Sequence, residues 1–258
     1  MEVNQLLGKA VCLFTQELRT NLTGIYLHGS LAMGCFKKDR SDVDLLIVVK
    51  EKISEKTKRK LIEGTIRLEE QCKVYPLEWS VILQTEVKKP SHPVHFLLHY
   101  SAFHKPHYLT NPDYKCEEGR DPDLTAHLMV TYERGRCLFG VPIREMFKKP
   151  EEADYFQAIY YDIHNAEEHI AENPVYYVLN LCRVYQYALT KMVSSKKEGG
   201  EWGVTFLPSE YHHLLRLSLK KYAGEGQSEK LPGPLLKKFA GFMIREIKNY
   251  CFSEMGRT

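Results

Sequence analysis

Residues 27–49 read LHGSLAMGCFKKDRSDVDLLIVV, and this stretch decides the fold. It opens on a Gly29-Ser30 turn and ends in an apolar strand that starts at Asp42. Side chains two apart on a strand point to the same face, so Asp42 and Asp44 project together beside the turn. Two carboxylates on one face repel each other unless a cation lies between them. The spacing therefore predicts a cation site at the start of a buried strand.

The residue types in this stretch favour magnesium and phosphate. Mg²⁺ commonly binds one or two carboxylates together with substrate phosphates. The Gly29-Ser30 turn can present backbone N–H groups and a hydroxyl to such phosphates. A further carboxylate, Glu78, lies in a predicted strand at residues 75–83 among apolar and aromatic neighbours, where an unpaired charge is costly. On a strand beside the aspartate pair, Glu78 would act as a general base or as a shared metal ligand.

The patterning divides the chain into two parts, 1–149 and 150–258. The first part alternates apolar strands with amphipathic helices, which are predicted at residues 4–20 and 56–71. The second part has helical spacing at residues 151–171, 174–192, 208–223 and 231–250; after Pro174, for example, apolar residues recur at i, i+3 and i+4. We therefore predict an α+β fold, with an N-terminal mixed-sheet domain followed by a C-terminal α-helical bundle domain.

Composition excludes several classes of protein. The 36 basic and 33 acidic residues leave a net charge of only +3, which gives no support to a nucleic-acid-coating protein. The longest apolar run, residues 45–49, is far shorter than the roughly 20 residues that a bilayer requires. The seven cysteines form no CxxC pair, and the N-terminus lacks the pattern of a secretory signal. We expect a cytoplasmic monomer with no nucleic-acid or membrane partner.

A cluster of histidines offers a competing hypothesis. His92, His95 and His99 have i, i+3, i+7 spacing, which would place three imidazoles on one face of a helix as a conceivable zinc site. Spacing of this kind is more often a partly buried helix surface.

The order of motifs resembles a known active-site signature. A Gly-Ser turn, an Asp-x-Asp strand start and a later strand carboxylate resemble the DNA polymerase β-like nucleotidyltransferases. The whole chain is similar to the aminoglycoside (3'')(9)-adenylyltransferase, or AadA-like, family. The first half is similar through residues 27–49. The second half is similar through NPVYYVLNLCRVYQYALTKMVSSKKEGGEWG at 173–203 and FLPSEYHHLLRLSLKKYAGE at 206–225.

This resemblance implies roles for individual residues. Asp42 and Asp44 would bind Mg²⁺, and Glu78 falls where the family places its catalytic base. The nucleotide would contact residues of both parts and lie in a cleft between them. These residues are Gly29, Ser30, Ser41, Asp123, Arg183, Lys196 and Tyr222.

The resemblance also bears on the acceptor. Dual-specificity members of the family use a tryptophan and an aspartate to hold streptomycin, and these positions correspond to Phe103 and Asn173 here. Tyr176, one turn after Asn173, would narrow the same pocket. Phenylalanine attracts a guanidinium less strongly than tryptophan, and asparagine lacks the negative charge. The substitutions predict that spectinomycin is the better acceptor.

The resulting hypothesis is an aminoglycoside adenylyltransferase that transfers AMP from Mg-ATP to a drug hydroxyl and so confers resistance. Two alternatives stay open. One is a nucleotidyltransferase with another acceptor, such as a protein, an RNA or a different small molecule. The other is a non-catalytic nucleotide-binding module, although such a module has no need to keep a repulsive carboxylate cluster.

Overall fold

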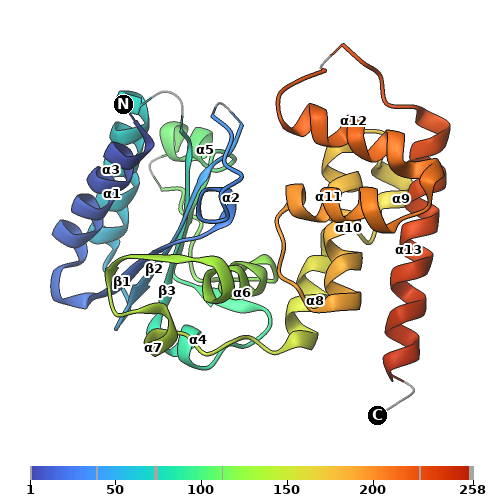
Figure 1. Ribbon diagram of the computed structural model, residues 1–258. Helices are drawn as coiled ribbons and strands as arrows, with labels where there is room; N and C mark the ends of the chain where they lie inside the picture. The colour runs from blue at the N-terminus through green and yellow to red at the C-terminus, as the bar shows by residue number, and fades with distance from the viewer. Residues whose placement is uncertain (1, 39, 73–74, 112, 227, 256–258) are drawn as a thin grey trace. The chain divides into compact units, whose positions relative to one another are not determined.

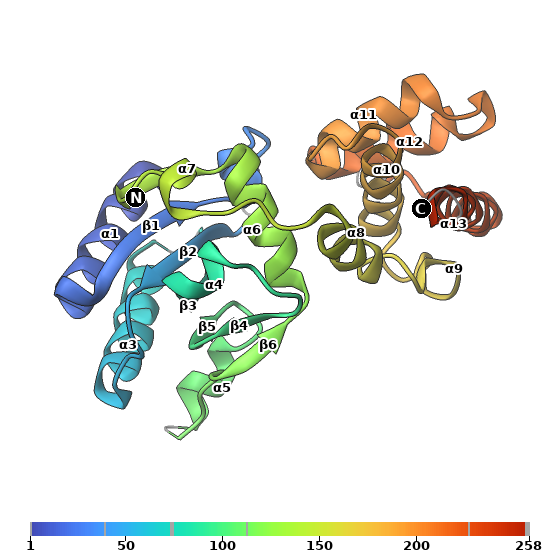
Figure 2. The same ribbon diagram turned by 90° about the horizontal axis from the view of Figure 1, so that it is seen from below.

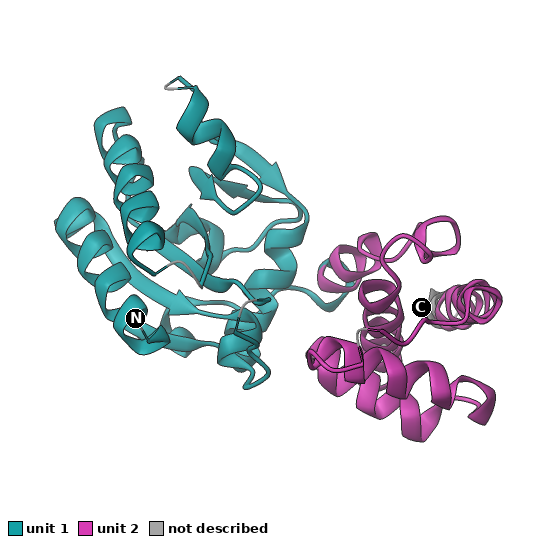
Figure 3. Cartoon of the chain, turned by 90° about the horizontal axis from the view of Figure 1, so that it is seen from above, with its two compact units in different colours: residues 1–154 teal, residues 155–258 magenta. Residues whose placement is uncertain are grey.

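A computed structural model describes residues 2–38, 40–72, 75–111, 113–226 and 228–255, and for 251–255 the backbone only. The chain forms two compact units, Met1–Asp154 and Tyr155–Thr258 (Figure 3). Each unit is described by itself below. No helix of the described chain is long and apolar enough to cross a membrane.

Unit 1 is built on a five-stranded sheet with the strand order β5-β3-β2-β1-β7. Strands β2 and β3 are parallel, and the other neighbours are antiparallel. A separate pair, β4 and β6, is antiparallel. The strands are β1 (Leu22–Leu27), β2 (Val43–Val49), β3 (Leu77–Leu83), β4 (Val94–Phe96), β5 (Leu98–Tyr100), β6 (Gly119–Asp121) and β7 (Arg136–Gly140).

Helices α1 (Val3–Leu18) and α3 (Glu55–Cys72) cover one face of this sheet, as Figure 2 shows. Alternate strand residues point to this face and form an apolar core with the helices. Phe14 of α1 meets Trp79 of β3 edge to face, with ring centroids 5.4 Å apart. The large aromatic side chains anchor the helices to the central strands.

The opposite face carries a second, smaller core that includes Tyr26, Leu46 and Ile82. Toward the start of β2 and β3 the same face becomes polar. Asp44 lies two residues before Leu46 and Glu78 lies four residues before Ile82, so both carboxylates point to the face that carries these apolar side chains. The apolar core thus holds the strands in place, and the polar end of the same face, with Asp44 and Glu78, is where a functional site can form. The helices near this face include α4 (Gln84–Lys88), α6 (Asp123–Arg134) and α7 (Ile143–Met146); unit 1 also contains the short helices η1 (Arg19–Asn21), α2 (Gly29–Ala32) and α5 (Lys105–Thr110).

Unit 2 is helical, with α10 packed against α11, α12 and α13 (Figure 1). Gly199 of α11 lies so close to α10 that an added Cβ would be 2.8 Å from the Cα and the N of Arg183. The helices are α8 (Glu152–Tyr161), α9 (Ala166–His169), α10 (Pro174–Thr190), α11 (Lys196–Phe206), η2 (Ser209–Tyr211), α12 (His212–Tyr222) and α13 (Gly233–Met255). The expected fold class, a mixed-sheet part followed by helices, is confirmed.

The helical interpretation of the histidine segment is wrong. His95 lies in β4 and His99 in β5, so the three imidazoles do not share a helix face. Val94, Phe96, Leu98 and Tyr100 are buried, whereas His95 and His99 are only partly buried; the exception is Leu97, which lies between the two strands and is also buried. This period of two is the spacing of strands, and it outweighs the coincidental helical spacing of the histidines.

Candidate active site

Three carboxylates gather where β2 and β3 begin. In the parallel pair, Asp44 lies directly beside Glu78, and Asp42 immediately precedes β2. The backbone N–H of Val43, between the two aspartates, donates to Pro76 O over 2.8 Å. The parallel register therefore brings together residues that are more than thirty positions apart in the sequence.

The Gly29 turn lies against one of these carboxylates. Gly29 has a φ of +64°, and an added Cβ would be 1.8 Å from Oδ2 of Asp44. The N–H of His28 donates to the carbonyl of Asp44 over 3.0 Å, which joins the end of β1 to β2. Glycine is required here both for the left-handed backbone and for the close approach of the carboxylate.

The setting of Glu78 suits a proton acceptor. Burial raises the pKa of its carboxyl above the ordinary value, and the like charge of Asp42 adds to this effect. The positive charge of His127 acts in the opposite direction. A carboxylate with a raised pKa is a stronger base than a solvated one, so it accepts a proton from a hydroxyl more readily.

Two histidines at the site were not predicted from the sequence. Nε2 of His127 lies 3.4 Å from Oδ2 of Asp123, one turn earlier on α6. Burial lowers the pKa of His127, but Asp123 and the strand carboxylates outweigh it and raise the value to about 10. The ring of His28 is 4.7 Å from that of His127, and burial holds its pKa well below the usual value. The i, i+4 spacing of Asp123 and His127 was a usable signal.

The donor set fits magnesium supplemented by substrate. Among the described residues, no group of three or more His, Cys, Asp or Glu side chains is arranged to hold a metal ion alone. Mg²⁺ does not need such a group, because one or two carboxylates and the substrate phosphates can complete its shell. Asp42 and Asp44 have side chains of this kind, and the repulsion between Asp42 and Glu78 is what a bound cation would relieve.

The two serines occupy different positions. Ser30 is in α2, directly after Gly29, and is partly exposed. The hydroxyl of Ser41 accepts a hydrogen bond from the N–H of Lys37 over 3.1 Å, which closes the loop before β2. The predicted phosphate contacts of both serines remain predictions.

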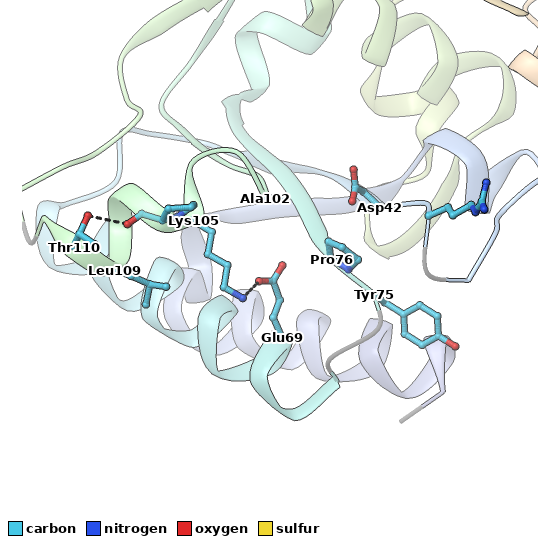
Figure 4. Close-up of a pocket in the computed structure, with 10 residues that line it drawn as sticks. Asp42, Glu69, Tyr75, Pro76, Ala102, Lys105, Leu109 and Thr110 are labelled. Carbon is cyan, nitrogen blue, oxygen red and sulfur yellow. Dashed lines mark hydrogen bonds and ion pairs between the residues drawn. The ribbon is translucent and has the colours of Figure 1, made fainter. Parts of the chain in front are cut away.

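A cavity of about 770 Å³ borders the site on the side of Asp42 (Figure 4). Lys105 and Glu69 form an ion pair of 2.7 Å in its wall, and Glu69 also accepts from Tyr100 and from the N–H of Leu77. The volume is in the range of drug-sized ligands. Its lining residues are Arg40, Asp42, Glu69, Tyr75, Pro76, Ala102, Lys105, Pro106, Leu109 and Thr110.

Phe103 follows a residue of this cavity wall. The neighbouring Ala102 lines the cavity, whereas the Phe103 side chain is 75% exposed. Because so little of the Phe103 surface is buried within the protein, its ring is available to contact a ligand. Its predicted acceptor contact stays a prediction.

In unit 2, two of the predicted nucleotide residues, Arg183 and Lys196, lie where α10 and α11 pack together. Nη2 of Arg183 donates to Oδ2 of Asp162 over 3.2 Å. Nζ of Lys196 lies 5.1 Å from the centre of the Tyr176 ring, a cation–π contact. The remaining predicted residues are Asn173, the exposed N-cap of α10, and Tyr222, the last residue of α12.

Two family matches divide the chain in the same order as its fold. Residues 11–101 match the family described as "Nucleotidyltransferase domain". Residues 145–246 match "Aminoglycoside adenylyltransferase, C-terminal domain". The two matches give the chain the domains of an AadA-like nucleotidyltransferase. It is therefore an enzyme of the nucleotidyltransferase type.

Curated relatives of this AadA-like protein have modest identity and broad coverage. It is 28% identical over 214 residues, 80% of each chain, to spectinomycin 9-adenylyltransferase of Staphylococcus aureus. It is 23% identical over 252 residues, 95% of each chain, to aminoglycoside (3'') (9) adenylyltransferase of Shigella flexneri.

A solved structure shares the fold. The spectinomycin adenyltransferase AAD(9) of Enterococcus faecalis, determined with ATP and spectinomycin, superimposes with a TM-score of 0.80 at 20% identity. The match covers 96% of the AadA-like chain and 100% of the other. Both units of the fold therefore have a counterpart in the solved enzyme.

Proposed function

We propose that the protein transfers AMP from Mg-ATP to a hydroxyl of an aminocyclitol antibiotic, with spectinomycin as the preferred acceptor. The observation that carries this proposal is the carboxylate cluster at the start of β2 and β3, with Gly29 pressed against Asp44. The names of the relatives support the nucleotide and the class of acceptor.

The chemistry divides between the three carboxylates. Asp42 and Asp44 would hold Mg²⁺, which neutralises charge on the attacking and leaving oxygens when it is bound. Glu78 accepts the proton of the acceptor hydroxyl as its oxygen forms a bond to the α-phosphorus of ATP. The bond between the α-phosphorus and the bridging oxygen breaks, and pyrophosphate leaves with the electron pair. The products are the AMP ester and pyrophosphate.

The acceptor preference rests on Phe103 and Asn173. Phe103 is exposed and keeps an aromatic face, although it attracts a guanidinium less strongly than tryptophan. Asn173 is exposed at the start of α10 and carries no charge that could pair with a guanidinium. Charge-assisted hydrogen bonds are about twice as strong as neutral ones. The missing charge at position 173 should therefore lower the affinity for streptomycin more than the affinity for spectinomycin.

The test is an adenylylation assay with both drugs at saturating Mg-ATP. We expect efficient modification of spectinomycin and poor modification of streptomycin. Efficient use of streptomycin by the unmutated protein would contradict the assigned preference. Modification of neither drug would leave the other-acceptor alternative, in which a different hydroxyl compound, a protein or an RNA is adenylylated.

The base assignment is tested separately by Glu78→Gln. The amide has nearly the same shape but cannot accept the proton, so turnover should fall by at least about a hundredfold. Binding of Mg-ATP, followed by equilibrium titration, should remain, whereas Asp44→Asn should weaken it by removing a ligand of the ion. Near wild-type turnover in Glu78→Gln would show that another group is the base.

A further inference from the structure

The turn between α8 and α9, residues 162–165, connects two helices of unit 2 (Figure 2), and two side-chain hydrogen bonds tie it to α10. Asp162 Oδ2 accepts from Nη2 of Arg183 over 3.2 Å. Asn165 Oδ1 accepts from the hydroxyl of Tyr177 over 3.1 Å. Both contacts fasten the same turn to the same helix, but only the first involves a residue predicted to bind the nucleotide.

The guanidinium of Arg183 is held by Asp162, but not all of its N–H donors have hydrogen-bond partners. Its side chain is 17% exposed and that of Asp162 is 22% exposed. Nε of Arg183 is buried and has no hydrogen-bond partner among the described residues. Buried donors are nearly always paired, and a guanidinium has five N–H donors to place. The incomplete pairing favours a further acceptor, such as a phosphate oxygen, over an ion pair with a purely structural role.

The backbone of Arg183 is fixed independently of this ion pair. Gly199 places the first turns of α11 directly against the Cα and N of Arg183. The freedom that remains belongs to the long side chain, which has many rotamers and loses entropy when it is held in one of them. A carboxylate that restricts this side chain before the ligand arrives reduces the cost of binding.

We propose that Asp162 is a positioning residue that holds the Arg183 guanidinium ready for the triphosphate of ATP. The proposal rests on the proposed function, because that function supplies the triphosphate as the ligand of Arg183. The negative charge of Asp162 also repels the phosphates. The proposal therefore requires that the gain from positioning exceeds this repulsion.

The experiment is an equilibrium titration of the full-length protein with Mg-ATP and, in parallel, with AMP. Asp162→Ala should weaken Mg-ATP binding about tenfold, a modest loss for a misplaced binding group. AMP lacks the outer phosphates, so its affinity should change less than about twofold by the same reasoning. Tyr177→Phe is the matched control, because it cuts the other tie of the turn and should change neither affinity.

A double-mutant cycle shows whether Asp162 acts through Arg183. In the Arg183→Ala background, Asp162→Ala should cause no further loss of Mg-ATP affinity. Asp162→Asn keeps the shape and one acceptor, so it should lie between the wild type and Asp162→Ala, and it serves if the alanine variant does not fold.

Three results would overturn the inference. Unchanged Mg-ATP binding in both Asp162 variants would show no net gain from positioning, and tighter binding would show that the repulsion dominates. Equal losses for Mg-ATP and AMP, matched by Tyr177→Phe, would show that Asp162 only fastens the turn. If the wild type does not bind Mg-ATP, the proposed function falls together with the inference. If the wild type binds Mg-ATP and the Asp162 variants bind it equally well, only the inference falls.

Discussion

At the scale of single residues, Gly29 connects the sequence motif to the chemistry. Its φ of +64° costs any other residue strain, and a Cβ would collide with the Asp44 carboxylate at 1.8 Å. Gly29→Ala should therefore displace Asp44 and abolish adenylyl transfer, with a loss of thermal stability. Turnover and melting temperature are the measurements.

Gly34 provides a control for backbone strain alone. Its φ is +73°, and an added Cβ would have nothing within 4 Å. Gly34→Ala should cost about 1–2 kcal/mol of stability, the usual penalty of a left-handed residue, and leave turnover near normal. Equal losses of activity in the two variants would show that strain in the loop matters more than the contact with Asp44.

A second residue-scale prediction concerns acid stability. Burial lowers the pKa of His99 from its ordinary value to about 4, and Nδ1 of His99 is 2.9 Å from the hydroxyl of Ser80. Between pH 6.5 and 4 the His99 imidazole is protonated in the unfolded chain but stays neutral in the folded chain. Folding stability is therefore fully present above pH 6.5 and is lost as the pH falls toward 4.

The variant His99→Asn tests this linkage. Its amide oxygen can accept from Ser80, and it does not titrate. The wild type should lose up to about 3 kcal/mol more than the variant over this interval, at 1.36 kcal/mol for each pKa unit. Urea unfolding at pH 7, 5.5 and 4 provides the comparison. Parallel pH profiles in the two proteins would show that His99 is not responsible.

The strand residues of the site could be predicted from the sequence, but the two histidines that lie near them could not. Asp42, Asp44 and Glu78 could be predicted because strand periodicity and the cost of a buried charge are local properties. The facing of His28 and His127 depends on how α6 lies over the sheet, which is set by non-local packing. The Arg183–Asp162 pair is another non-local contact, because its members are 21 positions apart in the sequence.

At the scale of elements, the long apolar-patterned segments were predicted well and the short or glycine-rich ones were not. Helices α1, α3 and α10 have strong 3.6-residue periodicity, and their predicted ranges agree with the structure to within a few residues. Helix α11 was missed because its glycines have low helix propensity. Its capping box, Ser195 with Glu198, was the available signal.

The glycines of α11 give an element-scale prediction. Gly199→Ala raises helix propensity, but its Cβ would lie 2.8 Å from the backbone of Arg183, so α10 and α11 must separate. We expect a loss of about 1–3 kcal/mol from overpacking and weaker Mg-ATP binding through Arg183. Unfolding in urea and an ATP titration would measure both effects.

Gly8 of α1 is the matched control for helix propensity. It also lies inside a helix, but an added Cβ there has nothing within 4 Å. Gly8→Ala should therefore stabilise the protein by about 0.5–1 kcal/mol and leave ATP binding unchanged. If Gly199→Ala stabilised the protein to the same extent, the close packing of α10 and α11 would not limit the size of the residue at 199.

At the scale of the whole molecule, the predicted ligands of the nucleotide are divided between two units. Unit 1 holds the carboxylate cluster and the Gly29 turn, and unit 2 holds Arg183 and Lys196. Each unit buries an apolar core of its own, so each has the means to fold as a separate fragment. The order of the two family matches along the chain agrees with this division.

Separating the units should therefore separate folding from function. A fragment of residues 1–154 keeps Asp42, Asp44 and Glu78, and its sheet should give cooperative unfolding and a near-native circular dichroism spectrum. Without Arg183 and Lys196 it should bind Mg-ATP at least about tenfold more weakly than the full chain, because two cations predicted to contact the phosphates are lost. It should transfer no AMP.

The complementary fragment, residues 155–258, decides how to interpret that loss. If the fragment carries only phosphate ligands, adding it in excess should restore part of the ATP affinity of the first fragment. The recovered affinity should fall when the added fragment carries Arg183→Ala. Undiminished ATP binding by the first fragment alone would mean that unit 1 contains the complete nucleotide site. The roles of Arg183 and Lys196, and with them the positioning role of Asp162, would then have to be abandoned.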